Sequence, residues 1–234
     1  MLTYCKFCKK DFSLRYKKQI FCSVICSNNY NLNNKKSIAL PKKYSADLAE
    51  LFGILLGDGS VTKYYTKVYL NLIADQGYEK TVILLIKKLF LNIKLCIMER
   101  PKRGTREIQI SSKEVSDYFI KIGFNPKNRN VPKWILKNKK FKHSCVRGLF
   151  DTEGSISIKK FDGKNGTYTY KQLTFTNKNK ELLSFVEKTL KEFGFSPTQN
   201  SKANIYISNK KDIEKYFDII GSNNPKLEKK LKIK

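Results

Sequence analysis

The sequence predicts an α+β fold built from two similar halves and preceded by a small cysteine-rich module. Three observations carry this prediction: an internal repeat, alternating helical and strand periodicity within each repeat, and four cysteines in the first 26 residues. We expect a zinc-finger-like module at residues 1–30, a basic linker at 31–44, and the two repeats at 45–143 and 144–234.

The internal repeat is visible as matching segments in the same order. Residues 53–60 (GILLGDGS) realign with residues 148–155 (GLFDTEGS), 95 positions later. Near the end of each half, residues 125–127 (NPK) match residues 224–226 (NPK), 99 positions later. Because order and spacing are nearly constant, the two halves are expected to share one fold and to be related by a pseudo-two-fold axis.

In each half the sequence pattern predicts a helix, two strands, a helix, two strands and a final helix. In the first half, residues 46–56 form the opening helix, with Ser45 or Asp47 as its N-cap. Strand periodicity follows at 67–73, where Val68, Leu70 and Leu72 point inward. The rest of this half is a helix at 78–90, a hairpin of 93–100 and 106–110, and a helix at 113–122.

The second half repeats this order. We expect helices at 144–152, 180–193 and 212–220 and strands at 155–160, 171–176, 197–200 and 204–208. The segments at 60–66 and 161–169 are expected to be loops.

The opening helix of each half carries a face of small side chains at helical spacing. In the first helix these are Ala49, Gly53 and Gly57, and in the second Ser144, Gly148 and Thr152. Small residues at i, i+4 and i+8 let two helix backbones approach closely. The sequence therefore predicts that the two opening helices pack against each other.

An acid follows each small face: Asp58 in the first half and Glu153 in the second. Side by side at two helix C-termini, these carboxylates would repel each other and the negative helix ends. Divalent Mg²⁺ or Mn²⁺ would relieve that repulsion, and such a cluster suits phosphodiester hydrolysis. The alternative is that the acids only end the helices before Gly59 and Gly154; their recurrence in register favours the metal site.

The four N-terminal cysteines form two spaced pairs, Cys5/Cys8 and Cys22/Cys26. Two such pairs in an intracellular chain fit tetrahedral Zn²⁺ better than disulfides. Four unrelated reduced cysteines are the alternative. The pattern resembles treble-clef zinc fingers, which implies a structural zinc ion held by all four thiolates.

Composition points to a polyanionic partner. The chain has 47 Lys+Arg and 20 Asp+Glu, a formal net charge of +27. Part of this excess can reflect an A·T-rich genome, but no acid occurs between Asp117 and Asp151 while nine basic residues do. No apolar run reaches the roughly 18 residues of a membrane span, so we expect a soluble intracellular protein, in the cytoplasm or nucleoid.

Residues 51–59 (LFGILLGDG) and 146–154 (VRGLFDTEG) resemble the paired motifs of LAGLIDADG homing endonucleases. Residues 131–135 (VPKWI) before the second motif extend the resemblance, which covers about 45–234. It implies two αββαββα repeats forming a sheet-lined saddle on duplex DNA. Two motifs in one chain resemble the monomeric branch, which implies one chain on one long asymmetric target.

The resemblance also implies roles for individual residues. Asp58 and Glu153 would be the catalytic metal ligands, helped by the backbone carbonyls of Gly57 and Thr152. Asp151, at the motif's sixth position, is Leu56 in the first copy and is interpreted as structural. Basic residues near the cleaved phosphates are expected to be Lys127 and Lys226, with Arg129 or Asn130 as competitors to Lys127.

DNA recognition is expected from the outward faces of the strands. Arg suits guanine, and Asn or Gln suits adenine; the candidates are Asn71, Arg103, Arg106, Gln109, Gln172 and Asn204. The predicted function is a metal-dependent, site-specific double-strand DNA endonuclease of a mobile element. The alternatives are an RNA-splicing maturase and a non-cleaving DNA-binding regulator; retention of both acids argues against the regulator.

Overall fold

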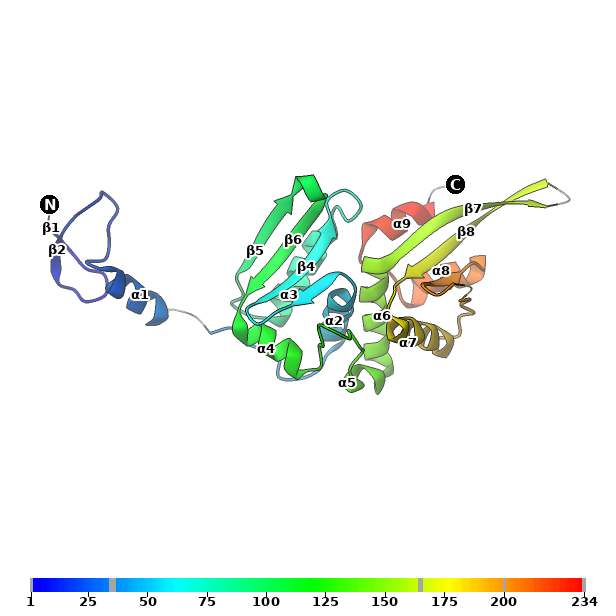
Figure 1. Cartoon of the computed structure of the whole chain (residues 1–234), viewed down its shortest axis with the longest axis horizontal. Helices are drawn as coiled ribbons and strands as arrows, with labels where there is room; N and C mark the ends of the chain where they lie inside the picture. The colour runs from blue at the N-terminus through cyan, green and yellow to red at the C-terminus, as the bar shows by residue number, and fades with distance from the viewer. Residues whose placement is uncertain (1, 34–36, 164–165, 200, 233–234) are drawn as a thin grey trace. The chain divides into compact units, whose positions relative to one another are not determined.

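The computed structural model describes residues 2–33, 37–163, 166–199 and 201–232 (Figure 1). Within it the chain divides into two compact units, Met1–Ala39 and Leu40–Lys234. In the described ranges, no helix is long and apolar enough to cross a membrane.

The N-terminal unit is a small hairpin followed by a helix. Strands β1 (Leu2–Tyr4) and β2 (Asp11–Ser13) pair antiparallel, and α1 spans Val24–Asn33. Among residues 2–33, Cys5 is the only apolar residue that is fully buried. This unit therefore has almost no hydrophobic core of its own.

The larger unit contains both repeats, and its α+β class is as predicted. The first repeat comprises α2 (Ala46–Asp58), β3 (Gly59–Val61), β4 (Tyr65–Asn71), α3 (Tyr78–Leu89), β5 (Leu95–Arg100), a 3₁₀ turn (Pro101–Arg103), β6 (Thr105–Ser111) and α4 (Lys113–Lys121). A short helix, α5 (Lys133–Leu136), leads to the second repeat. That repeat comprises α6 (Lys139–Glu153), β7 (Gly154–Gly163), β8 (Gly166–Thr176), α7 (Lys180–Glu192), β9 (Asn204–Ile207), α8 (Lys210–Ile219) and α9 (Pro225–Lys232).

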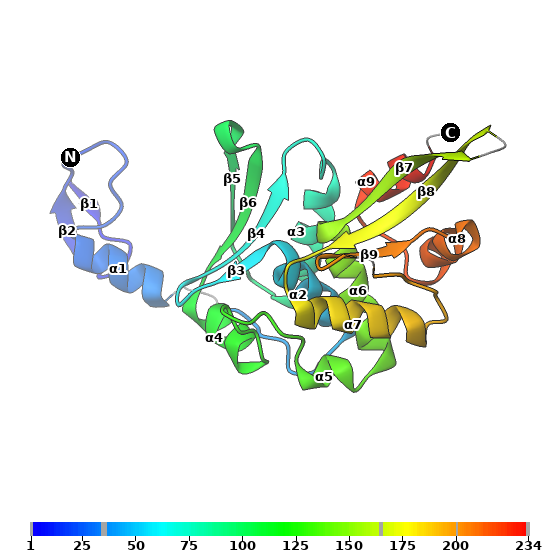
Figure 2. The same ribbon diagram turned by 45° about the vertical axis from the view of Figure 1, so that its right-hand side comes forward.

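Each repeat carries one antiparallel sheet. The strand order is β3-β4-β6-β5 in the first sheet and β7-β8-β9 in the second. Figure 2 shows α2 and α6 side by side, with one sheet on either side of this central pair. The predicted pseudosymmetric pair of repeats is therefore observed.

Several expected boundaries were wrong. Helix α6 begins at Lys139 rather than Ser144, because the Asn138 side chain caps it by accepting from the Phe141 amide. The expected loop at 161–169 is mostly strand, since β7 and β8 pair as far as Gly163 and Gly166. The expected strand at 197–200 is reduced in its described part to one bridge, between Thr198 and Tyr206.

The two opening helices pack closely because their facing side chains are small, as predicted. A Cβ built on Gly53 would overlap the Cys145 carbonyl, and one on Gly148 would overlap the Glu50 carbonyl. Both neighbours are backbone atoms inside helices, so neither can move aside cheaply. The two helices are thus held at a separation that only glycine permits at these points.

Substitution of Gly148 by Ala should therefore destabilise the protein. The added methyl has no space against α2, and overpacking of this kind costs about 1–3 kcal/mol. Chemical denaturation of the full chain measures the loss. Lys188→Ala on the exposed side of α7 is the matched helical control and should change stability by less than about 0.5 kcal/mol. Equal stability of Gly148→Ala and wild type would contradict the close packing.

Candidate functional site

The paired acids lie at the ends of the two central helices. Asp58 is the last residue of α2 and Glu153 the last residue of α6. A Cβ built on Gly57 would lie 3.2 Å from Cγ of Glu153, so the Glu153 side chain packs directly against the end of α2. Both acids are half-buried. The structure thus brings the two predicted carboxylates to one place.

The surroundings of both acids disfavour negative charge. Burial raises the pKa of Asp58 above its ordinary value, and the nearby charge of Asp75 raises it further. Burial also raises the pKa of Glu153 to about 7, with a second contribution from the charge of Asp58. Lys226 and Arg129 lower both pKa values without offsetting the burial. The site is therefore short of positive charge when both acids are ionised.

Arg129 reaches the end of α2 from the segment that follows α4. Its guanidinium donates to the carbonyls of Gly57 at 2.9 Å and Gly59 at 2.8 Å. Its backbone is left-handed, with φ of 48°, a conformation that is strained for a non-glycine residue and is often found at functional sites. Lys127, the first candidate here, is instead exposed to solvent. The competing candidate Arg129 is the one placed beside Asp58.

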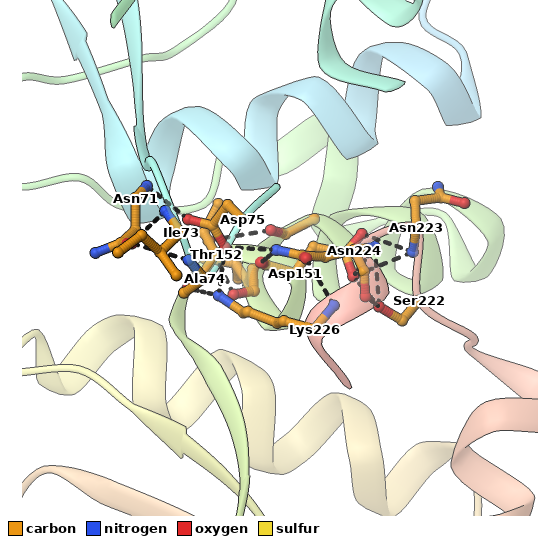
Figure 3. Close-up of polar contacts among 12 residues, drawn as sticks. Asn71, Ile73, Ala74, Asp75, Asp151, Thr152, Ser222, Asn223, Asn224 and Lys226 are labelled. Carbon is orange, nitrogen blue, oxygen red and sulfur yellow. Dashed lines mark hydrogen bonds and ion pairs between the residues drawn. The ribbon is translucent and has the colours of Figure 1, made fainter. Parts of the chain in front are cut away.

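Lys226 occupies the corresponding place at the end of α6. Its ammonium donates to the Thr152 carbonyl at 2.9 Å and pairs with Asp75 at 3.0 Å, as Figure 3 shows. Gly57 and Thr152 are the residues immediately before the two acids. Each half therefore places one basic side chain on the carbonyl preceding its acid: Arg129 in the first half and Lys226 in the second.

Asp75 is part of this site but was not anticipated from the sequence. It lies in the turn between β4 and α3 and is 4% exposed. One oxygen accepts from the side chain of Asn224 at 2.8 Å, and the other from the backbone of Asn71 at 2.8 Å. Asp75 therefore fixes both the β4–α3 turn and the position of Lys226.

A second unanticipated residue, Asn177, contacts Glu153 directly. Its side-chain amide donates to Oε1 of Glu153 at 3.0 Å. This bond lowers the pKa of Glu153, although burial outweighs it. Asn177 directly follows β8. From the sequence it is only a polar residue after a strand, and no pattern links it to Glu153.

Asp151 has the structural role expected for it. It is fully buried, and its carboxylate accepts from the Ser222 hydroxyl at 2.5 Å and the Asn223 amide at 3.1 Å (Figure 3). Asn224 also donates to the Asp151 carbonyl, at 2.7 Å. Asp151 thereby fixes the turn that precedes α9. This turn positions α9, which contains Lys226, next to the site.

The donor set at the helix ends fits a hard divalent cation. Two carboxylates whose pKa values are raised by burial and by neighbouring negative charge would be stabilised by an added positive charge. Carboxylate and carbonyl oxygens are the ligands that Mg²⁺ takes in proteins. The carbonyls of Gly57 and Thr152 already accept hydrogen bonds, but each carbonyl oxygen has a second lone pair.

Metal-free protein should lose stability as the pH rises through this site. The pKa of Glu153 is raised from 4.5 to about 7, so the unfolded chain ionises first and stability falls between about pH 4.5 and 7. With discount for partial exposure, the loss is roughly 1 kcal/mol. Thermal melting of Glu153→Gln in EDTA should show that part of the pH dependence removed, while Glu187→Gln on α7 retains it. An unchanged pH dependence in Glu153→Gln would contradict the raised pKa.

The open faces of the sheets carry three of the six predicted recognition residues. In β6, Ile108 and Ile110 are buried, so Gln109 between them points to the other face. In the second sheet Leu173 and Ile205 are buried, so the neighbouring Gln172 and Asn204 face the same open side of that sheet. Arg103 is exposed in the 3₁₀ turn.

Most of the predicted recognition residues are hydrogen-bonded within the protein: Gln109 donates to Ser111, Gln172 to Ser208 and Asn204 to Ser201. Arg106 and Asn71 are engaged as well. Arg106 shares the face of Ile108 and pairs with Glu79 of α3 at 3.0 Å and Glu99 at 2.7 Å. It is therefore turned to the helix-covered side of the sheet, away from the open face. Asn71, at the end of β4, uses its side-chain oxygen to accept from the amides of Ile73 and Ala74 (Figure 3).

The four N-terminal cysteines gather at one point of the smaller unit. All four sulfur atoms lie within 4.8 Å of one another, with 3.6 Å from Cys8 to Cys22 and 3.5 Å from Cys22 to Cys26. Tetrahedral zinc with bonds of 2.3 Å would set sulfurs about 3.8 Å apart. Cys5 completes the four at the end of β1. The sulfur spacing thus fits a structural zinc site.

The sheets and paired helices define a class of fold with two pseudosymmetric repeats. Residues 140–221 match the family of LAGLIDADG-like domains. This match lies within the second repeat, so that part of the chain is a LAGLIDADG-like domain.

Solved structures share the fold of the two repeats. The homing endonuclease I-DmoI in complex with DNA and Mn has a TM-score of 0.53 and 23% identity, covering 75% of this chain and 96% of that chain. Full-length DUF199/WhiA from Thermatoga maritima has a TM-score of 0.55 and 19% identity, covering 82% of this chain and 59% of that chain. At these identities the likeness concerns the fold alone.

Two curated relatives each contain a segment that is similar to most of this chain. The RNA polymerase subunit Rpo1C of Methanocaldococcus jannaschii is 24% identical over 192 residues, which is 77% of this chain and 21% of that protein. The ribonucleoside-diphosphate reductase NrdEB subunit alpha of Bacillus subtilis is 27% identical over 192 residues, 75% of this chain and 16% of that protein. The chain thus spans about a fifth or less of both relatives.

Proposed function

We propose that this chain is a site-specific double-strand DNA endonuclease of the homing type. The observation that carries the proposal is the meeting of Asp58 and Glu153 at the ends of the two central helices, with one basic side chain beside each. Paired carboxylates in a chain of net charge +27 suit hydrolysis of a polyanion's phosphodiester bonds.

The residues divide the work of cleavage between the two halves. Asp58 and Glu153, with the carbonyls of Gly57 and Thr152, would hold Mg²⁺ or Mn²⁺, which when bound supplies Lewis-acid stabilisation of the phosphate under attack. Arg129 and Lys226 keep those carbonyls in place and offer positive charge to the two phosphates. Each half contributes one carboxylate and one basic side chain. One chain therefore has the groups to cut both DNA strands of an asymmetric site.

The relatives favour a mobile genetic element, because a segment similar to this chain occurs in proteins of different activity. A polymerase subunit and a reductase subunit differ in activity, yet both contain a segment similar to this chain. A segment found within such different proteins behaves as an inserted unit. The homing endonuclease I-DmoI supplies the corresponding structural precedent, solved with DNA and Mn.

A non-cleaving DNA-binding role and RNA splicing are the competing functions on this fold. Neither requires two carboxylates held together at helix ends where burial raises the pKa of both, and that arrangement favours cleavage. The test is to incubate the purified chain with a randomised duplex DNA library and Mg²⁺ and to sequence the broken ends. Double-strand breaks at one long, weakly palindromic sequence support the proposal; intact DNA at saturating protein overturns it.

A further inference from the structure

An acid occupies the middle of the open face of the first sheet, where the proposed function would place DNA. Register pairs Glu107 of β6 with Tyr69 of β4 and Met98 of β5. The neighbouring Ile108 is buried on the helix side, so Glu107 points to the open side. A carboxylate there would repel phosphate and weaken DNA binding unless it has a compensating role.

Two basic side chains neutralise this acid. Nζ of Lys67 lies 3.3 Å from one carboxylate oxygen of Glu107, and Nε of Arg100 lies 3.4 Å from the other. Burial alone would raise the pKa of Glu107, but these two charges hold it below its ordinary value. Glu107 is therefore ionised at neutral pH and bound on both oxygens.

The acid itself is covered, whereas Arg100 is not. Glu107 is 7% exposed, so it does not reach a base edge. The Arg100 side chain is half exposed and lines a hollow of about 770 Å³ on this face, together with Tyr69, Lys102 and Arg103. The contact with Glu107 uses Nε rather than a terminal nitrogen of Arg100. One terminal nitrogen lies 3.7 Å from Sδ of Met98.

Resting on the proposed function, we propose that Glu107 is a specificity-determining positioning residue that orients Arg100 to read a guanine in the major groove. A guanidinium fixed at Nε presents two terminal nitrogens in the plane needed for O6 and N7 of guanine. An arginine free to rotate would instead bind any nearby phosphate. Glu107 therefore weakens non-specific attraction to phosphate and makes Arg100 more selective for guanine.

The test is selection of bound duplexes from a randomised library by the full chain in Ca²⁺, which needs no cleavage. Wild type should enrich a site with a guanine preferred at one position of one half-site. Glu107→Gln should lose that preference by about tenfold or more, because a bidentate arginine–guanine pair is worth that much discrimination. Its affinity for random DNA should stay equal or rise, since one negative charge is gone.

Two further variants make the result interpretable. Arg100→Lys keeps the charge but not the planar fork, and it should lose the preference at the same position. Glu187→Gln on α7 removes the same charge away from this face and should keep the wild-type site. If wild type enriches a site and either Glu107→Gln or Arg100→Lys retains every preference, the inference is overturned. If wild type enriches no sequence, the proposed function itself is overturned.

Discussion

Replacement of Asp58 by Asn or Glu153 by Gln is expected to abolish double-strand cleavage. Each change keeps the shape of the side chain but removes one of the two negative charges that would bind the metal. Because the same change relieves repulsion with phosphate, DNA affinity should stay within about tenfold of wild type. Cleavage of supercoiled plasmid carrying the selected site, with Mg²⁺, measures the loss, and gel shift in Ca²⁺ measures binding.

Matched controls separate this effect from a general change of charge. Asp117→Asn on α4 and Glu187→Gln on α7 remove the same charge from exposed or half-exposed positions outside the site, and both should cleave at the wild-type rate. Linear plasmid from Asp58→Asn or Glu153→Gln at rates near wild type would remove both acids from the chemistry. Loss of DNA binding alongside cleavage would instead indicate that the acids serve mainly to hold the helix ends together.

The repeat in the sequence was sufficient to predict where the acids meet. Small residues before Asp58 and before Glu153 predicted a close helix pair, and a close pair forces the two C-terminal ends together. This inference needed only helical periodicity, which is local information. Lys226 was proposed from the family resemblance, which implies a basic residue just beyond the last helix of each half, and in the structure it lies at the end of α6.

The remainder of the site depends on loops that periodicity does not describe. Arg129 replaces Lys127 because a left-handed residue turns the chain after α4, and no pattern marks that turn. Asp75 has no repeated signature, since it works by contact with Asn224 and Lys226 from the other half of the unit. Arg106 is a different case: strand alternation alone placed it on the face of Ile108, so the sequence already contained the information that excludes it from the open side.

Zinc is expected to be required for folding of residues 2–33, with one tightly bound ion per chain. Cys5 is the only fully buried apolar residue among residues 2–33, so the apolar contacts there are too few to offset the entropy of ordering the chain. Four thiolates on zinc supply the missing free energy, and small zinc modules are commonly unfolded without metal. Cys8→Ser or Cys22→Ser should therefore lose the ion and leave this segment unfolded.

Metal analysis and limited proteolysis together measure this dependence. Wild type should contain one zinc and resist cleavage within residues 2–30, whereas Cys8→Ser should contain none and be cut there at least about tenfold faster. Cys96→Ser removes an exposed thiol outside the cluster and should behave as wild type. A zinc-free wild type that remains equally resistant would contradict the ligand assignment, because the segment would then have a source of stability other than metal. Zinc retained by Cys8→Ser with full resistance would show that three thiolates suffice and that Cys8 is not needed as a ligand.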